Sequence, residues 1–376
     1  MSLSQPVRRF AFGQGVVLWD GWGSRLFVYN DTMRLLCPSL AKGTTIGELA
    51  AILVGTYDVD RQRALADAAA LLEHLQSEGL LEGSRDERVP PEATGAAELS
   101  DADGEIGSFT TRINGTNIRI GAIAATAEFL RPLFPEPQWC GGAAECEILC
   151  RPDGRSSLVT VDGGLRARID DPLEVTGAIL EQVIRAVNPA REWLAFLHAG
   201  SVRRNGAAIV LPAVSGSGKS TLVGFLASNG FEYLSDDLVP LVAPRGEVAA
   251  CPLAINLKAG SRGLYPAPAG FEAVTFPDRF RTGQLLLPPP RLWETPPAPP
   301  RAIVFPRYAP NIRTGFAPIA PIDGLTRLFG DRVFLGYPLE EARIANFLRW
   351  AEQTPFYGLE YSELTEAARC LATLTG

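Results

Sequence analysis

The residues from Ser215 to Thr221 have the composition of a loop that wraps phosphate. They read Ser-Gly-Ser-Gly-Lys-Ser-Thr, and small residues leave backbone N–H groups free to point at anionic oxygens. A helix that begins here adds the positive end of its dipole. Lys219 would reach the β- and γ-phosphates, and the Ser220 hydroxyl would hold Mg²⁺. The run therefore predicts that ATP and Mg²⁺ are bound by Ser215, Gly216, Ser217, Gly218, Lys219, Ser220 and Thr221.

The flanking segments supply the strand and the helix that such a loop needs. Residues 207–212 are an apolar run that fits a buried parallel strand, and residues 221–227 have a helical apolar face that Asn229-Gly230 ends. The usual pattern G-x-x-x-x-G-K-[ST] has Ala213 in place of its first glycine, which is acceptable where that position avoids positive φ. The alternative is a glycine-rich turn that binds nothing. Lys-Ser at the helix start favours the phosphate loop.

Two adjacent carboxylates, Asp236 and Asp237, follow Lys219 by 17 and 18 positions, which is about one helix and one strand. We expect Asp236 to accept the proton of an acceptor hydroxyl and Asp237 to share Mg²⁺ with Ser220. The two roles are interchangeable, because the sequence does not decide which carboxylate faces the metal. Neighbouring carboxylates also raise one another's proton affinity, which suits a base near neutral pH. The alternative is an ordinary Asp-Asp turn after a strand.

Composition excludes several classes of protein. A chain of 376 residues suggests two or three domains, and 46% hydrophobic residues are enough for a sizeable core. With 35 basic and 42 acidic residues the net charge is −7, which argues against a nucleic-acid or anionic-membrane binder. Neither a signal peptide nor a membrane-spanning run is recognisable, so we expect a cytoplasmic protein. The sequence leaves open whether it forms a homo-oligomer.

Six cysteines fit that compartment as reduced thiols. Cys140, Cys146 and Cys150 follow the spacing C-x5-C-x3-C, which lacks the paired C-x2-C of zinc sites. Packing as small apolar residues is the preferred interpretation.

The chain divides at a polar linker, residues 83–98. Residues 1–82 predict three strands (8–12, 16–20 and 25–29) and then three helices, which is a small winged-helix-like α+β domain. The helices are expected from a cap at Asn30, from a capping box of Thr45 with Glu48, and over residues 61–79. Seven prolines in residues 288–300 predict a stiff surface loop.

Residues 29–32, 43–49, 57–60 and 71–81 resemble the PqqD family. Members of that family bind the leader segment of ribosomally made peptide precursors on behalf of a partner enzyme. The resemblance implies that a peptide pairs with the sheet edge at residues 25–29 and rests on the helix 61–78. The alternatives are a winged helix that only packs against the remainder of the chain, or one that binds DNA, which the acidic composition disfavours.

Residues 99–190 predict a β-rich layer with a helix at 172–186 and no recognisable chemistry, and residues 191–376 predict an α/β layer around the phosphate loop. The second part resembles the HPr kinase family, protein serine kinases with a P-loop of their own type. His198 opens the run His-Ala-Gly-Ser-Val 21 positions before Lys219, and the loop 213–221, the segment 230–237 and the segment 257–264 follow in the family's order.

The resemblance implies roles for three further residues. His198 would contact Asp236 or phosphate, although it could equally be a core histidine. Lys258 and Arg262 would neutralise charge at the transferred phosphoryl group, although either could be a solvated surface cation. The family's signature loop is partial, because Arg262-Gly263-Leu264 is followed by Tyr265-Pro266 and not by glycine and isoleucine. Acceptor specificity and phosphatase activity are therefore left open.

Together these features predict an ATP- and Mg²⁺-dependent phosphotransferase, a serine kinase whose HPr kinase-like domain spans residues 99–376. Its acceptor would be a serine hydroxyl of a precursor peptide or small protein captured by residues 1–82, with no nucleic-acid or membrane partner. The chain looks closer to HPr-kinase-related enzymes found with peptide-modification systems than to the carbon-regulation kinase. The rival interpretations are an HPr-type kinase in metabolic regulation, a small-molecule kinase, and a nucleotide-binding switch without phosphate transfer. An ABC-type ATPase is disfavoured because Leu-Ser-Gly-Gly is absent.

Overall fold

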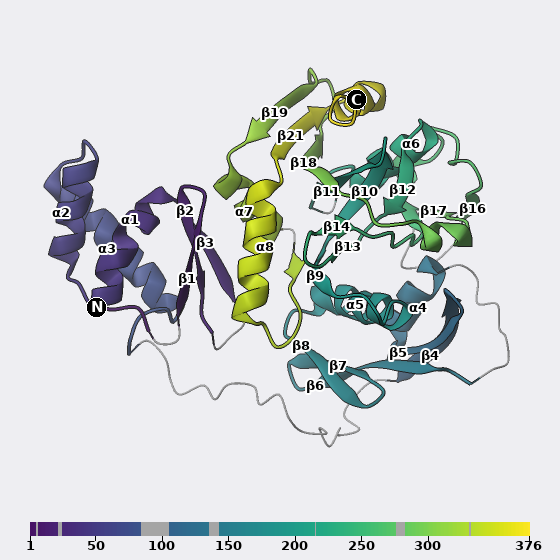
Figure 1. Ribbon diagram of the computed structural model, residues 1–376, viewed down its shortest axis with the longest axis horizontal. Coiled ribbons are helices and arrows are strands. Elements are labelled where there is room, and N and C mark those ends of the chain that lie inside the picture. Colours follow the sequence, from purple (N-terminus) through teal and green to yellow (C-terminus); the bar gives the residue numbers. More distant parts are fainter. Residues whose placement is uncertain are drawn as a thin grey trace. The chain divides into compact units, whose positions relative to one another are not determined.

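The computed structural model describes residues 1–4, 7–21, 25–83, 105–134, 143–214, 216–275, 283–330 and 332–376. The protein is a mixed α/β chain that splits into two compact units (Figure 1). The first unit comprises Met1–Gly95 with Pro321–Thr326, and the second comprises Ala96–Ala320 with Arg327–Gly376. Most of the predicted linker, residues 83–98, lies outside the described residues.

Three strands followed by three helices build the first unit, in the predicted order. They are β1 (Arg8–Phe12), β2 (Gly15–Trp19), β3 (Leu26–Tyr29), α1 (Asp31–Lys42), α2 (Ile46–Thr56) and α3 (Arg61–Ser77). The strands pair antiparallel in the order β1-β2-β3. Asn30 caps α1 through its side chain, and Thr45 forms the predicted capping box with Glu48 at the start of α2.

An apolar stripe on α3 closes the core of the first unit. Ala64, Ala68, Leu72 and Leu75 recur at helical spacing and are buried, together with Leu18 of β2 and residues of α1. Leu65 and Leu71 at the sides of this stripe are only partly buried. The opposite face of α3 therefore remains available to solvent.

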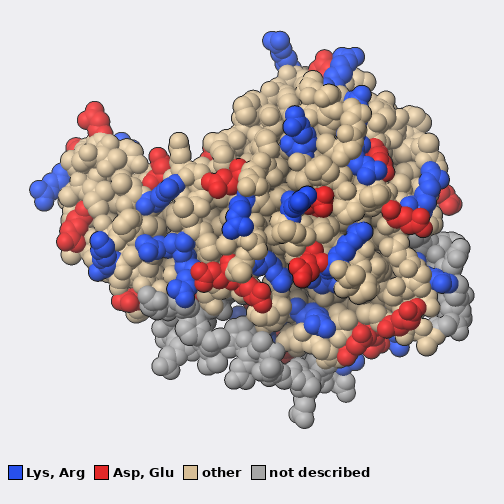
Figure 2. Space-filling model, viewed as in Figure 1, with Lys and Arg blue, Asp and Glu red and all other residues tan. Residues whose placement is uncertain are grey.

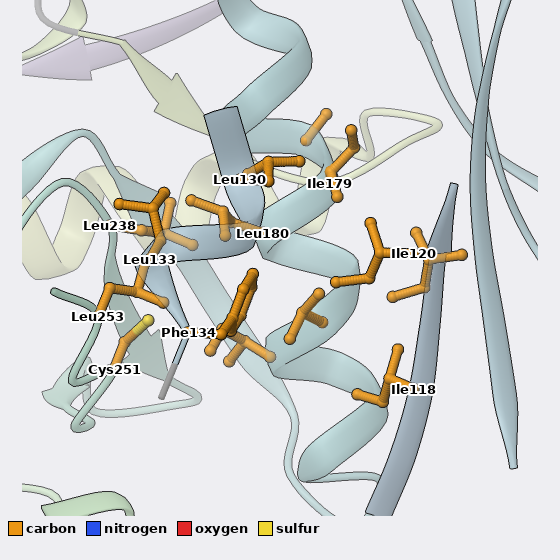
Figure 3. Packing of buried hydrophobic residues seen from close by; sticks show 14 of the residues in the cluster. Ile118, Ile120, Leu130, Leu133, Phe134, Ile179, Leu180, Leu238, Cys251 and Leu253 are labelled. Carbon is orange, nitrogen blue, oxygen red and sulfur yellow. The ribbon is translucent and has the colours of Figure 1, made fainter. Parts of the chain in front are cut away.

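The second unit begins with a β-rich layer. Its strands β4 (Ile106–Ile113), β5 (Thr116–Ile123), β6 (Cys146–Asp153), β7 (Ser156–Val161) and β8 (Gly164–Ile169) form one sheet in chain order. The helices of this part are α4 (Ala124–Leu130), the 3₁₀ turns η1 (Arg131–Leu133) and η2 (Pro172–Glu174), and α5 (Val175–Val187). Ile179 and Leu180 of α5 join the same buried cluster as Ile118 and Ile120 of β5 (Figure 3).

The cysteines of this layer pack as the sequence predicts. Cys150 of β6 is buried, and burial raises the pKa of its thiol to about 11. Cys146 is half-buried, and Cys140 lies outside the described residues. No cluster of three or more His, Cys, Asp or Glu side chains that could hold a metal occurs among the residues that the structure describes.

A six-stranded sheet in the order β12-β10-β11-β18-β21-β19 forms the rest of the core. These strands are β10 (Ala199–Arg204), β11 (Ala207–Pro212), β12 (Glu232–Ser235), β18 (Pro300–Tyr308), β19 (Gly315–Ile319) and β21 (Phe356–Tyr361). Strands β11, β18 and β21 are mutually parallel, and β10 runs antiparallel to both β11 and β12. The helices α6 (Lys219–Ser228) and α9 (Leu364–Thr373) pack against this sheet and contact each other.

Two smaller sheets complete the second unit, with strand orders β14-β13-β9-β20 and β15-β17-β16. Their strands are β9 (Trp193–Leu197), β13 (Val239–Val242), β14 (Glu247–Val248), β15 (Ile255–Leu257), β16 (Glu272–Thr275), β17 (Gln284–Leu287) and β20 (Val333–Phe334). The remaining elements are η3 (Ala259–Ser261), η4 (Pro290–Glu294), α8 (Glu341–Gln353) and α7 (Pro321–Gly330), whose first residues group with the first unit.

The proline-rich segment differs from the predicted surface loop. Its 3₁₀ helix η4 buries the side chain of Trp293 in the core cluster of α5, and Ala298 is buried as well. Pro300 then opens β18. Prolines are tolerated here because the segment contains a 3₁₀ turn and the start of a strand, where few backbone N–H donors are needed.

The molecular surface in Figure 2 carries Lys and Arg side chains interspersed with Asp and Glu, without a large area of one sign on the face in view. Among the described helices, none combines the length and the apolar character that crossing a bilayer requires.

Candidate functional site

The strand order brings three distant segments of the second unit to one edge of the six-stranded sheet. The phosphate loop follows the end of β11, and Asp236 follows the end of β12. His198 directly precedes β10, which runs the other way between these two strands, with Ala199 opposite Pro212 and Ser201 opposite Ser235. Because β10 is antiparallel to both neighbours, its beginning lies beside their ends.

Two glycines of the loop adopt a left-handed backbone. Gly216 and Gly218 have φ values of 91° and 90°, a region that residues with a Cβ rarely adopt. Ala213 is buried and is not among the positive-φ residues, so alanine is acceptable there. Gly218 caps α6 without a side-chain hydrogen bond, which leaves the first N–H groups of the helix without a capping side-chain oxygen. Ser215 lies outside the described residues.

Lys219, the first residue of α6, is held by both predicted carboxylates. Its Nζ donates to Oδ1 of Asp237 at 2.7 Å and lies 3.3 Å from Oδ1 of Asp236. The lysine side chain is only 7% exposed. Burial lowers its pKa, but Asp236 and then Asp237 outweigh this effect, so the pKa is raised and the lysine is charged.

The two carboxylates differ in their surroundings. Asp236 is fully buried, and neither of its oxygens has a well-aligned hydrogen-bond donor among the described residues. Burial raises its pKa to about 6; Lys219 lowers it, Asp237 raises it, and the nearby Ser220 side chain lowers it. Asp237 is 36% exposed and has a φ of 78°, a left-handed conformation that is strained for a residue with a side chain.

The sequence predicts a contact of His198 with Asp236 or phosphate; in the structure His198 joins the same cluster through the backbone of Asp237. Its imidazole hydrogen-bonds the backbone of Asp237, and its own backbone N–H donates to the Arg332 carbonyl oxygen at 3.1 Å. Burial and the charge of Lys219 lower its pKa to about 4. His198 is therefore neutral near pH 7 and contributes a hydrogen bond, not a positive charge.

Two tyrosines that the sequence analysis did not single out also reach the loop. Tyr308 ends β18 and Tyr361 ends β21, and both strands run parallel to β11, so their ends share its edge. The N–H of Tyr308 donates to the Ser217 carbonyl oxygen at 3.0 Å, and the Tyr361 hydroxyl lies 3.4 Å from the Gly218 carbonyl oxygen. The sequence carried no signal for either residue, because each lies near the loop only through the order of strands in the sheet.

The loop that carries Lys258 and Arg262 packs on α6 through a neighbour. The Ser261 hydroxyl lies 2.7 Å from that of Thr221, in the first turn of α6. Arg262 donates to the Gly283 carbonyl oxygen at 2.8 Å, and Lys258 is exposed. The contact of either cation with a phosphoryl group stays a prediction.

Taken together, the cluster offers donors for an anion and acceptors for a cation. Lys219 and the uncapped N–H groups of α6 suit phosphate oxygens. The hydroxyl of Ser220 and the carboxylates of Asp236 and Asp237 are the oxygen ligands that Mg²⁺ prefers.

A second candidate site lies in the first unit, between strand β3 and helix α3. β3 is an edge strand, and no other described strand pairs with its second edge. The Tyr29 hydroxyl lies 3.3 Å from Nε2 of His74, and Arg25 contacts both the carboxylate and the carbonyl oxygen of Glu78, at 3.0 and 2.7 Å. Burial, and then Glu78, raise the pKa of Tyr29 to about 12. These contacts tie the predicted edge to the predicted helix.

Comparison with known proteins identifies part of the chain. The family model described as coenzyme PQQ synthesis protein D (PqqD) matches residues 15–81. A search of curated proteins found no match to the chain. The matched residues run from β2 through α3, so the predicted resemblance of this segment is confirmed. Residues 15–81 therefore form a domain of the PqqD family.

Proposed function

We propose that the protein is an ATP- and Mg²⁺-dependent kinase, related to the HPr kinases, that phosphorylates a serine of a peptide captured by its PqqD domain. The observation that carries the proposal is the cluster around Lys219. A lysine at the start of a helix, after a loop with two positive-φ glycines, contacts two adjacent carboxylates at 2.7 and 3.3 Å. Phosphoryl transfer needs this combination of an anion cradle, a metal ligand and a base.

The surroundings of the two carboxylates favour one assignment of their roles. Asp236 is buried beside Ser220, which suits a pair that shares Mg²⁺. Asp237 is partly exposed, so an acceptor hydroxyl can approach it. We therefore assign the metal to Asp236 with Ser220 and the role of base to Asp237. The sequence predicts the opposite roles for the two carboxylates but allows them to be exchanged.

In this mechanism the residues act as follows. Lys219 leaves Asp237 and neutralises the β- and γ-phosphate oxygens. Asp237 then accepts the proton of the serine hydroxyl. At the same time the serine oxygen bonds to the γ-phosphorus, and the bond between the γ-phosphorus and the oxygen bridging to the β-phosphate breaks. Mg²⁺ would neutralise charge on the phosphates. His198 stays neutral and orients the backbone of Asp237.

Peptide delivery rests on the PqqD domain. Proteins of that family bind leader segments of peptide precursors, and the second edge of β3, which pairs with no other described strand, offers the same mode of strand addition beside α3. The substrate would therefore be a precursor peptide whose leader pairs with β3.

The test combines calorimetry with a transfer assay on the full chain. We expect Mg-ATP binding to be lost in Lys219→Met and unchanged in Lys42→Met, a matched change of a lysine at the end of α1. Asp237→Asn should keep nucleotide binding and slow transfer of labelled γ-phosphate to the co-encoded precursor peptide by about 100- to 10,000-fold.

Each outcome separates the proposal from a rival. No uptake of Mg-nucleotide by the unaltered protein would refute the proposal altogether. Nucleotide binding without transfer to any peptide would favour a nucleotide-dependent switch. If Asp236→Asn abolishes transfer with binding intact, while Asp237→Asn weakens binding, the original assignment of the two carboxylates is the correct one.

A further inference from the structure

A cleft of about 540 Å³ opens in the second unit, built from residues of the β-rich layer, of α5 and of α8. None of its lining residues belongs to the phosphate-loop cluster. Its volume is in the range of clefts that bind small organic molecules, about 300–1,000 Å³. The cleft is lined mainly by polar and charged side chains, so its ligand should be polar.

One buried carboxylate at the cleft pairs with Arg185, and the charge of Arg343 also acts on it. Glu181 of α5 is 7% exposed and accepts from Nε and Nη2 of Arg185 at 2.9 and 2.8 Å. Burial raises the pKa of Glu181, and Arg185 and then Arg343 of α8 lower it, so both cations act on the same carboxylate. Arg185 neutralises Glu181 by direct contact, which leaves the guanidinium of Arg343 to act on a ligand.

Gly336 provides the room for this arrangement. It has a φ of 89°, and a Cβ at that position would collide with Nη1 of Arg343 and lie 3.8 Å from Nη2 of Arg185. Arg343 also donates to the carbonyl oxygen of Leu335 at 3.0 Å. The guanidinium of Arg343 is therefore held in place by the backbone of Leu335.

The other two carboxylates of the cleft are engaged with backbone. Glu145 accepts from the N–H of Asn117 at 3.2 Å, and Asp162 accepts from the N–H of Glu147 at 2.8 Å. Each carboxylate thus stabilises the end of a strand. The backbone donor partly compensates its charge, so it attracts a cationic ligand less strongly.

The donors of the cleft are not engaged to the same extent. Gln182 of α5 lines the cleft and is 5% exposed as a residue, and its amide makes no hydrogen bond with any described residue. Its amide atoms are not fully enclosed, so a ligand in the cleft can reach them. Arg166 of β8 adds an exposed guanidinium at the rim.

The geometry points to a second ligand site in this cleft, which takes a small organic oxyanion, a carboxylate or a phosphate ester. Arg343 and Arg166 would bind the oxyanion, and the Gln182 amide would donate to the same molecule. The volume exceeds what a free inorganic ion fills, so the charged group should be carried by a larger polar molecule. This inference is independent of the nucleotide site.

Calorimetry on the full chain tests the inference with three probes: citrate for the carboxylates, ribose 5-phosphate for the phosphate ester, and ribose as the uncharged control. We expect citrate or ribose 5-phosphate to bind and ribose not to bind. Arg166→Ala should weaken binding about tenfold, as expected for one lost charge-assisted contact. Arg168→Ala on the same strand and Arg349→Ala on the same helix as Arg343 should leave binding unchanged.

Lys219→Met separates this site from the phosphate loop, because the probe must still bind when that loop is disabled. The oxyanion that binds identifies the ligand chemistry, and binding of either supports the site. The inference is overturned if neither oxyanion binds at millimolar concentration, or if binding survives Arg166→Ala but is lost in Lys219→Met. Arg343→Gln is a second test, and Arg166→Ala decides alone if that variant does not fold.

Discussion

Two fully buried carboxylates, Asp20 in the first unit and Asp236 in the second, have opposite surroundings. Asp20 follows β2 and accepts from the backbone N–H and from Nε of Arg25, each at 3.3 Å, so its charge is compensated within its own turn. Asp236 has Lys219 at 3.3 Å but no well-aligned donor among the described residues. The pKa of Asp236 is raised to about 6, first by its burial.

The difference indicates what each carboxylate is for. Asp20 bridges the end of β2 to the start of β3, and its hydrogen bonds stabilise that connection. Asp236 is buried beside Lys219 and Ser220, but neither of its oxygens has a well-aligned donor among the described residues, so both remain available to a bound metal. A buried carboxylate with well-aligned donors points to structure, and one without them points to ligand chemistry.

Exchanging each carboxylate for its amide tests this comparison most strongly. Asp236→Asn should weaken Mg-ATP binding at least about 100-fold and change the free energy of unfolding by no more than about 1 kcal/mol, since the lost ion pair is offset by relief of a buried charge. Asp20→Asn should leave Mg-ATP binding unchanged and destabilise the protein by about 1–3 kcal/mol. Calorimetry and chemical denaturation measure the two effects. Equal loss of stability in both variants would contradict the comparison.

The glycines of the phosphate loop provide a matched pair with a smaller effect. An added Cβ at Gly218 would lie 2.8 Å from the Tyr361 hydroxyl oxygen and 3.1 Å from Cβ of Tyr308, whereas at Gly216 it meets nothing within 4 Å. Both positions have positive φ, so either alanine costs about 1 kcal/mol or more of backbone strain. We expect Mg-ATP binding to weaken about 30-fold in Gly218→Ala and about fivefold in Gly216→Ala.

That pair also has a clear negative result. If Gly216→Ala weakens nucleotide binding as much as Gly218→Ala, the contacts with Tyr308 and Tyr361 do not shape the loop, and only its backbone conformation matters.

The pH dependence of nucleotide binding has a smaller expected effect than Asp236→Asn or Gly218→Ala. A metal binds Asp236 only when the carboxylate is ionised, and its raised pKa of about 6 means that this form is complete well above pH 6 and lost as the pH falls through 6. Mg-ATP affinity should therefore be about tenfold lower at pH 5 than at pH 8. His198, with a pKa of about 4, adds no charge in this window.

Asp236→Asn serves as the control for that titration, since an amide has no proton to lose. A pH profile that stays the same in Asp236→Asn would assign the titrating group to another residue. Asp20→Asn should leave the profile unchanged, because Asp20 belongs to the other unit.

Local sequence patterns predicted most of the elements. The cap at Asn30, the capping box of Thr45 with Glu48 and the apolar stripe of α3 are all present, because each depends on residues three or four positions apart. The strand that precedes the phosphate loop and the helix that follows it were likewise visible as apolar runs. The burial of Trp293 was missed, because proline content describes the backbone and not what the following side chain packs against.

By itself the sequence determined which residue types are available for chemistry: the glycines and lysine of the loop, the pair of aspartates and the histidine. Only the tertiary structure decided that Tyr308 and Tyr361 reach the loop, that Asp236 is buried while Asp237 is partly exposed, and that Arg343 lines the same cleft as the pair of Arg185 and Glu181. Spacing along the chain reports contacts within a helix or a turn. Contacts between strand ends depend on the order and direction of strands in the sheet, which are set by packing across the whole unit.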